Sequence, residues 1–314
     1  MEEVKFSHVS VLLPECIENL DIKPNGIYVD GTTGGGGHSL EIVKRLTDGG
    51  RLICIDRDTD ALAAAAKRLE QYADRITFVH SNYSELDAVL RDLEIDTVDG
   101  VLLDLGVSSY QLDTAERGFS YMQDARLDMR MDQESSLSAY EVINEYSEEE
   151  LRRIIYEYGE EKFAKNIAAN IVKARAEAPI ETTLQLSELI KSSMPKAARE
   201  GGHHPAKRTF QAIRIEVNAE LTGIPPVIEA AVSRMNVGGR LAIITFHSLE
   251  DRIVKQTFAT LATGCTCPRE FPVCICNNKP KIKTVCKKPI TASDAELEVN
   301  PRSRSAKLRV AEKL

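Results

Sequence analysis

The sequence predicts an α/β protein with a doubly wound, mostly parallel sheet that is interrupted by an all-helical insertion. Over residues 1–112, short apolar runs alternate with segments of helical spacing, a pattern typical of parallel strands joined by crossover helices. From 113 to 217 there is no strand-like run. A fully apolar run then returns at Arg240–Phe246. Such a run is typical of a central strand covered on both faces, which favours one interrupted sheet over two domains in series.

We therefore expect a sheet domain formed by 1–112 and 218–314, with a helical domain at 113–217 inserted in it. Besides Arg240–Phe246, the predicted strands are Ile27–Asp30, Arg51–Ile55, Ile76–Val79 and Val98–Leu105, with candidate closing strands at Lys283–Cys286 and Lys307–Ala311. The predicted helices are Ser39–Leu46, Thr59–Leu69, Ser84–Leu93 and Leu249–Leu261 in the sheet domain, and Glu141–Asn144, Glu148–Tyr158, Glu160–Ala176, Thr183–Ser192 and Ala206–Asn218 in the insertion.

Composition limits the class of protein. The chain has 314 residues, of which 43% are hydrophobic, enough for a sizeable core. Its net charge of −8 argues against a uniformly basic nucleic-acid binder. The segment 265–314 is nevertheless basic, so it is either a local contact for a polyanion or a solvated tail. The N-terminus has no apolar signal core, and no apolar run approaches the roughly 18 residues that span a bilayer. We expect a cytosolic protein without membrane contact.

The segment IYVDGTTGGGGHS, from Ile27 to Ser39, reads as a strand, a glycine loop and a helix start. Glycines let the backbone approach a ligand closely. The spacing does not fit the dinucleotide fingerprint G-x-G-x-x-G/A, and no lysine follows as a phosphate loop requires. Asp30 at the end of the strand suits a cofactor that carries an amine, such as the methionine part of S-adenosylmethionine.

Further candidate cofactor residues follow the next strands. Asp56 ends the second strand, where an acid binds the ribose hydroxyls in related folds. Tyr83, after the third strand, could stack on an adenine ring or be an ordinary surface aromatic. Asp104 ends the fourth strand, within reach of a reactive methyl group, and Gln111 could touch the cofactor or the acceptor.

Ten motifs together make the chain resemble the bacterial MraW/RsmH methyltransferases. They are HVSVLLPE from His8, DGTTGGGGHS from Asp30, IDRD from Ile55, LLDLGVSS from Leu102, ERGFSYM from Glu116, LDMRMD from Leu127, YGEEKFAKNIA from Tyr158, KRTFQAIRIEVN from Lys207, GGRLAIITFHSLEDRIVK from Gly238 and NPRSRSAKLR from Asn300. The resemblance runs from about Phe6 to the C-terminus. It implies a Rossmann-like class I methyltransferase that methylates the exocyclic N4 of one cytidine in the decoding region of 16S rRNA, in free RNA or in the small ribosomal subunit.

The resemblance also implies a set of site residues. Its S-adenosylmethionine contacts correspond to Gly36, Gly37, His38, Asp56, Tyr83, Asp104 and Gln111. Relatives often have Phe in place of Tyr83, and many lack the cysteines between Cys265 and Cys286. The insertion corresponds to the part of the family thought to bind RNA.

The residue that accepts the proton of the target amine is less clear from the sequence. Many enzymes that methylate amines carry D/N-P-P-Y/F at the end of the fourth strand, whereas this chain has DLGV from Asp104. Asp104 or a backbone carbonyl at 105–107 is one candidate acceptor. His247 and Ser248 are a second candidate pair, although His247 could simply cap the helix that follows.

Two further groups of residues are candidates for binding. The cations expected to contact phosphate, each of which could instead be a solvated charge, are Arg126, Arg130, Lys207, Arg208, Arg214, Arg302, Arg304 and Lys307. Two C-x-C pairs, Cys265 with Cys267 and Cys274 with Cys276, could form a four-thiolate zinc site, with a reduced loop as the alternative. A disulfide conflicts with a cytosolic location.

Three other functions are compatible with parts of the pattern. One is a methyltransferase for another substrate, one is a non-catalytic ribosome assembly factor, and one is a dehydrogenase. The aspartates Asp30, Asp56 and Asp104 argue against a mere scaffold, and the broken fingerprint argues against a dehydrogenase. The sequence leaves the oligomeric state open, with a homodimer as one candidate.

Overall fold

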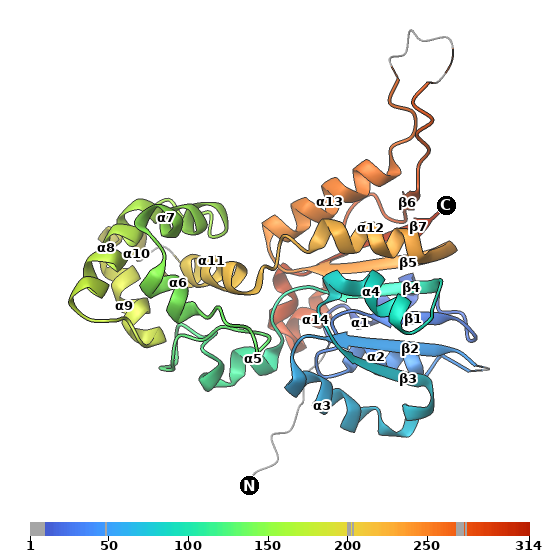
Figure 1. Cartoon of the computed structure of the whole chain (residues 1–314), viewed down its shortest axis with the longest axis horizontal. Coiled ribbons are helices and arrows are strands. Elements are labelled where there is room, and N and C mark those ends of the chain that lie inside the picture. The colour runs from blue at the N-terminus through green and yellow to red at the C-terminus, as the bar shows by residue number, and fades with distance from the viewer. Residues whose placement is uncertain (1–9, 48, 200–201, 203, 268–272, 274) are drawn as a thin grey trace. The chain divides into compact units, whose positions relative to one another are not determined.

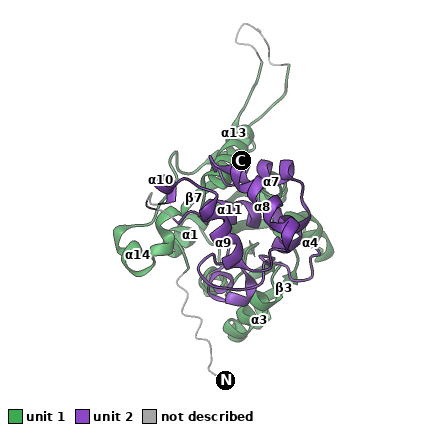
Figure 2. Ribbon diagram, turned by 90° about the vertical axis from the view of Figure 1, so that its left-hand side faces the viewer, with its two compact units in different colours: residues 1–106, 221–314 green, residues 107–220 purple. Residues whose placement is uncertain are grey.

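The computed structural model describes residues 10–47, 49–199, 202, 204–267, 273 and 275–314. It forms two compact units, one of residues 1–106 and 221–314 and the other of residues 107–220 (Figure 2). The chain leaves the first unit after Gly106 and returns to it at Leu221, a few residues from the boundaries expected at 112/113 and 217/218.

The first unit contains a seven-stranded sheet with the order β3-β2-β1-β4-β5-β7-β6 (Figure 1). The strands are β1 (Ile27–Asp30), β2 (Arg51–Asp56), β3 (Ile76–His80), β4 (Val98–Asp104), β5 (Met235–Thr245), β6 (Ile282–Thr284) and β7 (Lys307–Lys313). Strands β1 to β5 pair in parallel, while β7 pairs antiparallel with both β5 and β6. The predicted α/β class with a mostly parallel sheet is therefore confirmed. From β1, the chain builds the sheet first toward β3 and then, from β4, toward the other side, so the strand order reverses between β1 and β4.

Helices cover both faces of this sheet, as expected of a doubly wound fold. The helices of the unit are α1 (Leu13–Leu20), α2 (Gly37–Val43), α3 (Thr59–Arg68), α4 (Leu86–Asp92), α12 (Ile224–Arg234), α13 (Ser248–Ala262) and α14 (Asp294–Val299), with short 3₁₀ turns η1 (Glu70–Arg75), η2 (Tyr83–Glu85) and η4 (Pro301–Ser305). Side chains of α4, α12 and α13 form one buried cluster with the sheet. Those of α1, α2 and α3 form the other. Two apolar layers therefore hold the strand ends in fixed positions.

The second unit is built from helices around a separate apolar core. They are α5 (Ser109–Asp113), η3 (Ala115–Arg117), α6 (Ala139–Glu145), α7 (Glu148–Glu157), α8 (Ala164–Glu177), α9 (Thr183–Ser192), α10 (Lys196–Arg199) and α11 (Lys207–Asn218). Ser138, Ser147 and Thr182 cap α6, α7 and α9 through capping boxes. The helix expected from Glu160 begins only at Ala164, because Glu160 has a left-handed backbone with φ of 48°.

Candidate active site

Three aspartates lie at the carboxyl ends of three adjacent strands. Asp30 ends β1, Asp56 ends β2 and Asp104 ends β4. Since β1 pairs in parallel with both β2 and β4, these carboxylates share one edge of the sheet. In open α/β sheets, ligands bind beyond the carboxyl ends of the strands at the point where the strand order reverses. The first unit therefore brings together the three acids predicted from sequence.

Asp30 is a buried acid with only 1% of its surface exposed. Its Oδ2 accepts a hydrogen bond from Ser39 Oγ at 2.6 Å, and its Oδ1 accepts one from the Thr32 N–H at 3.2 Å. Burial raises the pKa of Asp30 to about 6, although these donors oppose the shift. Ser39 was not predicted as a site residue. Its contact with Asp30 depends on how the glycine loop folds, which no short motif encodes.

Asp56 joins the second strand to the glycine loop. Its Oδ2 accepts a hydrogen bond from the Gly34 N–H at 2.7 Å, and its Oδ1 accepts one from the Asp58 N–H at 2.9 Å. Burial raises the pKa of Asp56. Each carboxylate oxygen can accept a second hydrogen bond, so ribose hydroxyls can still be bound.

The glycine loop requires glycine at specific positions. Gly34 and Gly36 have φ values of 49° and 74°, a left-handed region that disfavours other residues. A Cβ atom on Gly31 would lie 2.6 Å from Leu103 Cδ2, so a side chain there would force the Leu103 side chain to move. The Gly36 N–H donates to the Thr33 carbonyl at 2.8 Å. The loop therefore runs close over the ends of β1 and β4.

Asp104 has one oxygen that the described part of the protein leaves without a hydrogen bond. This atom, Oδ1, is buried, whereas Oδ2 lies 3.7 Å from His38 Nδ1. The other ring nitrogen of His38, Nε2, lies 3.0 Å from the Val11 carbonyl, to which it must donate. Burial, together with the charges of Asp30 and Glu250, raises the pKa of Asp104 well above the usual aspartate value. A cationic ligand or an N–H donor would satisfy this carboxyl group.

Tyr83 is buried beside the loop, with 7% of its surface exposed. A Cβ atom on Gly31 would lie 3.3 Å from Tyr83 Cβ, and one on Gly223 would lie 3.3 Å from its ring. The Arg57 guanidinium lies 5.7 Å from the ring centroid. Tyr83 is thus close to the glycine loop and is no ordinary surface aromatic; its stacking on an adenine stays a prediction.

His247 is the N-cap of α13. The Glu250 N–H donates to His247 Nδ1 at 3.4 Å, and Glu250 Oε2 accepts hydrogen bonds from the Phe246 and His247 N–H groups. The sequence H-S-L-E places Glu three residues after the cap, a signature that could have identified Glu250 in advance. The adjacent Ser248 is exposed. The capping alternative for His247 therefore has direct hydrogen-bond support, and its catalytic alternative stays a prediction.

Gln111 belongs to the second unit, where its side chain helps to begin α5. Its Oε1 accepts a hydrogen bond from the Ser108 N–H at 3.0 Å, and its own N–H donates to Ser108 Oγ at 3.2 Å. Its predicted contact with the cofactor stays a prediction.

The cations predicted to bind phosphate differ in their surroundings. Arg130 is paired with Asp128 at 2.7 Å, Arg214 with Glu220 at 2.8 Å, and Lys307 with Asp251 at 3.1 Å. These internal partners make the three cations weaker candidates for RNA contact. The five exposed members of the set are Arg126, Lys207, Arg208, Arg302 and Arg304.

Three of the four predicted zinc ligands are described, and their sulfur atoms converge. The Sγ atoms of Cys265, Cys267 and Cys276 all lie within 4.8 Å of one another. Backbone N–H groups of Asn278 and Thr266 lower the pKa of the Cys276 thiol to about 5. Cys274, the fourth predicted ligand, lies outside the described residues.

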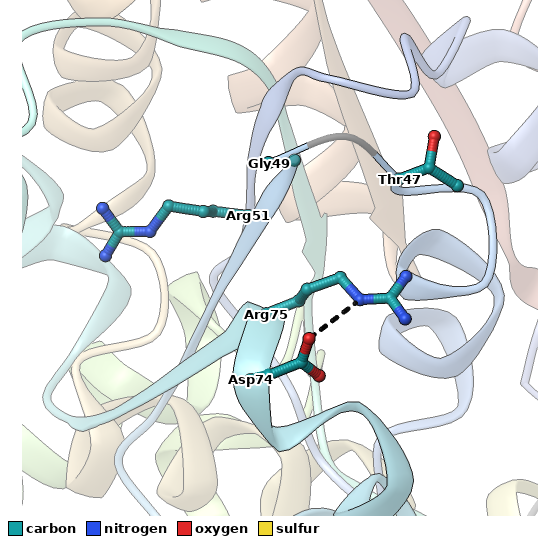
Figure 3. Close-up of a pocket in the computed structure, with 6 residues that line it drawn as sticks. Thr47, Gly49, Arg51, Asp74 and Arg75 are labelled. Carbon is teal, nitrogen blue, oxygen red and sulfur yellow. Dashed lines mark ion pairs between the residues drawn. The ribbon is translucent and has the colours of Figure 1, made fainter.

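A separate surface hollow lies at the opposite edge of the sheet, beside the starts of β2 and β3 (Figure 3). Arg51, Gly49 and Thr47 line it, with Asp74 and Arg75 forming an ion pair at 3.6 Å. None of the predicted site residues is among its lining residues, so it is not part of the candidate site.

Within the described ranges, no helix has the length and apolar character needed to cross a membrane.

The strand order, the glycine loop and the aspartates at neighbouring strand ends define a Rossmann-like methyltransferase. A model of the MraW methylase family matches residues 5–314, and the chain belongs to this family. It is 58% identical over 311 residues to proteins named ribosomal RNA small subunit methyltransferase H from Lachnospira eligens and Clostridioides difficile. Each alignment covers 99% of this chain, with 99% and 100% of the respective relatives.

Solved structures were compared as well. A putative rRNA methylase from Clostridium thermocellum is 12% identical, with a TM-score of 0.46, over 98% of this chain and 100% of that one. A putative methyltransferase from Streptococcus mutans, solved in complex with SAH, is 11% identical, with a TM-score of 0.44, over 98% of this chain and 100% of that one.

Proposed function

We propose that the chain binds S-adenosylmethionine over the glycine loop and transfers its methyl group to the exocyclic N4 of a cytidine in small-subunit rRNA. The observation that carries this proposal is the edge where Asp30, Asp56 and Asp104 end adjacent strands. The rRNA part rests on the printed names of the 58%-identical relatives, and the choice of N4 rests on the resemblance to the MraW/RsmH methyltransferases.

The electrostatics of the edge favour a cationic cofactor over a pyrophosphate. All three aspartates have raised pKa values, and burial is the main cause in each case. Bringing a positive charge to such a cluster stabilises the ionised carboxylates, whereas a dinucleotide phosphate would be repelled. S-adenosylmethionine carries a sulfonium and an amine, and when bound it supplies an electrophilic methyl group.

Each residue of the edge then has a separate task. We assign Asp30 to the amine of the cofactor, Asp56 to its ribose hydroxyls, and Tyr83 to its adenine. We assign the backbone of Gly36, Gly37 and His38 to contacts along the cofactor, and we keep Gln111 as a further predicted contact.

Asp104 is our candidate acceptor for the proton of the target amine. The N4 amine of cytosine is a poor nucleophile, since its lone pair is delocalised into the ring. The enzyme must therefore align the nitrogen and accept an N–H bond as positive charge develops. The buried Asp104 Oδ1 has no hydrogen-bond donor among the described residues, so it is suited to accept that bond. His247 with Ser248 is the second candidate for this task.

The second unit, residues 107–220, is our candidate for RNA recognition. Its exposed cations Arg126, Lys207 and Arg208 suit contacts to phosphate. The target base has to be unpaired or flipped out before its amine can reach the methyl donor.

The decisive experiment is a methylation assay with isotopically labelled S-adenosylmethionine. The purified protein is incubated with either naked 16S rRNA or assembled small subunits from cells that lack the enzyme. Labelled nucleosides are then identified by mass spectrometry. We expect N4-methylcytidine at one position. No label, or label on another base or another position, would overturn the proposal.

Two variants separate the candidate proton acceptors. We expect Asp104→Asn to bind the cofactor and to lose methyl transfer by at least about a hundredfold, the size typical of losing a general base. His247→Asn keeps a good helix N-cap and serves as the matched variant. Wild-type rates in Asp104→Asn together with loss of activity in His247→Asn would move the acceptor role to His247.

A further inference from the structure

The described residues between α13 and β6 form two arms that run side by side (Figures 1 and 2). The Lys281 N–H donates to the Leu261 carbonyl at 2.8 Å, and Asn278 Nδ2 donates to the carbonyls of Thr263 and Gly264 at 3.1 and 2.8 Å. The described side chains of this segment make little apolar core, since Val273 and Ile275 are each 69% exposed. The methyltransferase mechanism uses none of these residues.

Beyond the hydrogen bonds that join the two arms, the cysteine sulfur atoms have the spacing of metal ligands. Cys276 Sγ lies 3.7 Å from Cys265 Sγ, and the Sγ atoms of Cys265, Cys267 and Cys276 all lie within 4.8 Å of one another. A disulfide would require a separation of about 2.05 Å. Zinc bonded tetrahedrally to sulfur at about 2.3 Å places two sulfur atoms about 3.8 Å apart. The observed separation therefore matches an edge of a zinc–thiolate tetrahedron.

Backbone donors around the sulfur atoms also fit thiolates. The Thr266 N–H donates to Cys276 Sγ at 3.3 Å, and the N–H groups of Ile275 and Cys276 both donate to Cys267 Sγ at 3.3 Å. Such hydrogen bonds from outside the ligand set orient metal ligands and stabilise their negative charge. Two ligands on one arm and one on the other would cross-link the arms through the ion.

We propose that Cys265, Cys267 and Cys276 bind one Zn²⁺ ion that orders the segment between α13 and β6. Thiolates favour soft or borderline metals, and Zn²⁺ accepts tetrahedral sulfur coordination without redox chemistry. Binding displaces the protons of those thiols that are still protonated, so zinc uptake releases protons to solvent. Metal binding would supply ordering free energy that the exposed Val273 and Ile275 do not supply through apolar burial.

The first test is the metal content of the purified full-length protein. The protein is prepared with a non-thiol reductant, dialysed against ZnCl₂, freed of excess metal and analysed by elemental mass spectrometry. We expect about one zinc per chain in the wild type and less than about a tenth of that in Cys265→Ser/Cys276→Ser. Cys286→Ser is the matched control, because Cys286 is a nearby thiol outside the cluster, and it should retain the metal. No zinc in the wild type, or full zinc in the double variant, would overturn the proposal.

A second measurement tests whether the ion orders the segment. Its readout is independent of enzyme activity. Amide hydrogen exchange is compared between chelator-treated and zinc-reloaded protein. We expect zinc to slow exchange over 263–281 in the wild type and in Cys286→Ser, while Cys265→Ser/Cys276→Ser exchanges rapidly in both states. Equal exchange with and without zinc in the wild type would show that the ion does not order this segment. Replacing Zn²⁺ with Co²⁺ should give sulfur-to-cobalt absorption bands only in the proteins that retain the cluster.

Discussion

At the scale of single residues, Asp30 combines a cost in stability with the role in cofactor binding that we propose for it. Its pKa in the folded protein is about 6, above the ordinary aspartate value of about 3.9. The stability that this shift contributes is therefore fully present below pH 4 and is lost as the pH rises through 6. At pH 8 the buried charge costs the ligand-free protein about 3 kcal/mol.

We accordingly expect Asp30→Asn to raise the melting temperature of the ligand-free protein at pH 8 and to weaken cofactor binding by at least about tenfold. Asparagine can still hydrogen-bond Ser39 and the Thr32 N–H, so the loop should remain folded. Thermal unfolding at pH 8 and at pH 4, with and without cofactor, tests both effects. The stability gain should vanish at pH 4, and a variant that melts lower than the wild type at pH 8 would contradict this account.

The affinity for the cofactor should depend on pH for the same reason. Asp30 must be ionised to bind an amine, and the nearby Asp56 and Asp104 also have raised pKa values. We expect affinity to be nearly constant above pH 7 and to fall by up to about tenfold per pH unit as the pH drops below about 6. Calorimetric titrations from pH 5 to pH 8 measure this. Flat affinity over that range would show that the acids do not sense the ligand's charge.

The acids of the site were predictable because each one follows an apolar strand directly, so its place at the sheet edge follows from topology alone. Their partners were not. Ser39 reaches Asp30 through a contact that is set by the backbone angles of the glycine loop. The place of Asp104 at the end of β4 was predictable, but the approach of His38 to it was not.

At the scale of secondary-structure elements, Gly36 in the glycine loop before α2 can be compared with Gly49, a glycine outside that loop. Gly36 and Gly49 both have positive φ values, 74° and 87°. A Cβ atom on Gly36 would also lie 3.2 Å from Ala65 Cβ and 3.3 Å from Leu69 Cδ1, whereas one on Gly49 would meet nothing within 4 Å. The two positions thus share backbone strain and differ in crowding.

We expect Gly36→Ala to lower the free energy of unfolding by about 2–3 kcal/mol and Gly49→Ala by about 1 kcal/mol. Only Gly36→Ala should weaken cofactor binding, since only Gly36 belongs to the loop over the aspartates. Urea denaturation and calorimetry on both variants measure the two effects. Equal losses of stability would indicate that α3 yields to the added methyl group.

Strands β1 to β4 were easier to predict than helix α12 and the strands after it. The apolar runs of β1 to β4 are short and bounded by polar residues, so their positions followed from the sequence. Helix α12 was not predicted, although Pro225 and Pro226 lie in its first turn, where a missing N–H is tolerated. Strand β5 begins at Met235, before the predicted run Arg240–Phe246, because the strand continues through a register irregularity. The antiparallel pairing of β7 depends on contacts with β5 that local spacing does not encode.

At the scale of the whole molecule, charge is unevenly distributed along a chain of net charge −8. Arg302 and Arg304 are exposed in η4, whereas Lys307 and Arg309 in the following strand are paired with Asp251 at 3.1 and 2.7 Å. A phosphate backbone can approach exposed cations more readily than cations held against a carboxylate. The exposed arginine pair is therefore the better candidate for contact with RNA.

We expect Arg302→Ala/Arg304→Ala to weaken binding to 16S rRNA and to reduce the slope of log affinity against log salt by about 1–2. Lys287→Ala/Lys288→Ala removes the same charge from two exposed lysines of the same segment and is the matched control. Filter binding at several salt concentrations gives both slopes. An unchanged slope in the arginine variant would make this part of the segment a solvated surface. An equal change in both variants would mean that the RNA responds to total charge and that no specific phosphate contact is made at Arg302 and Arg304.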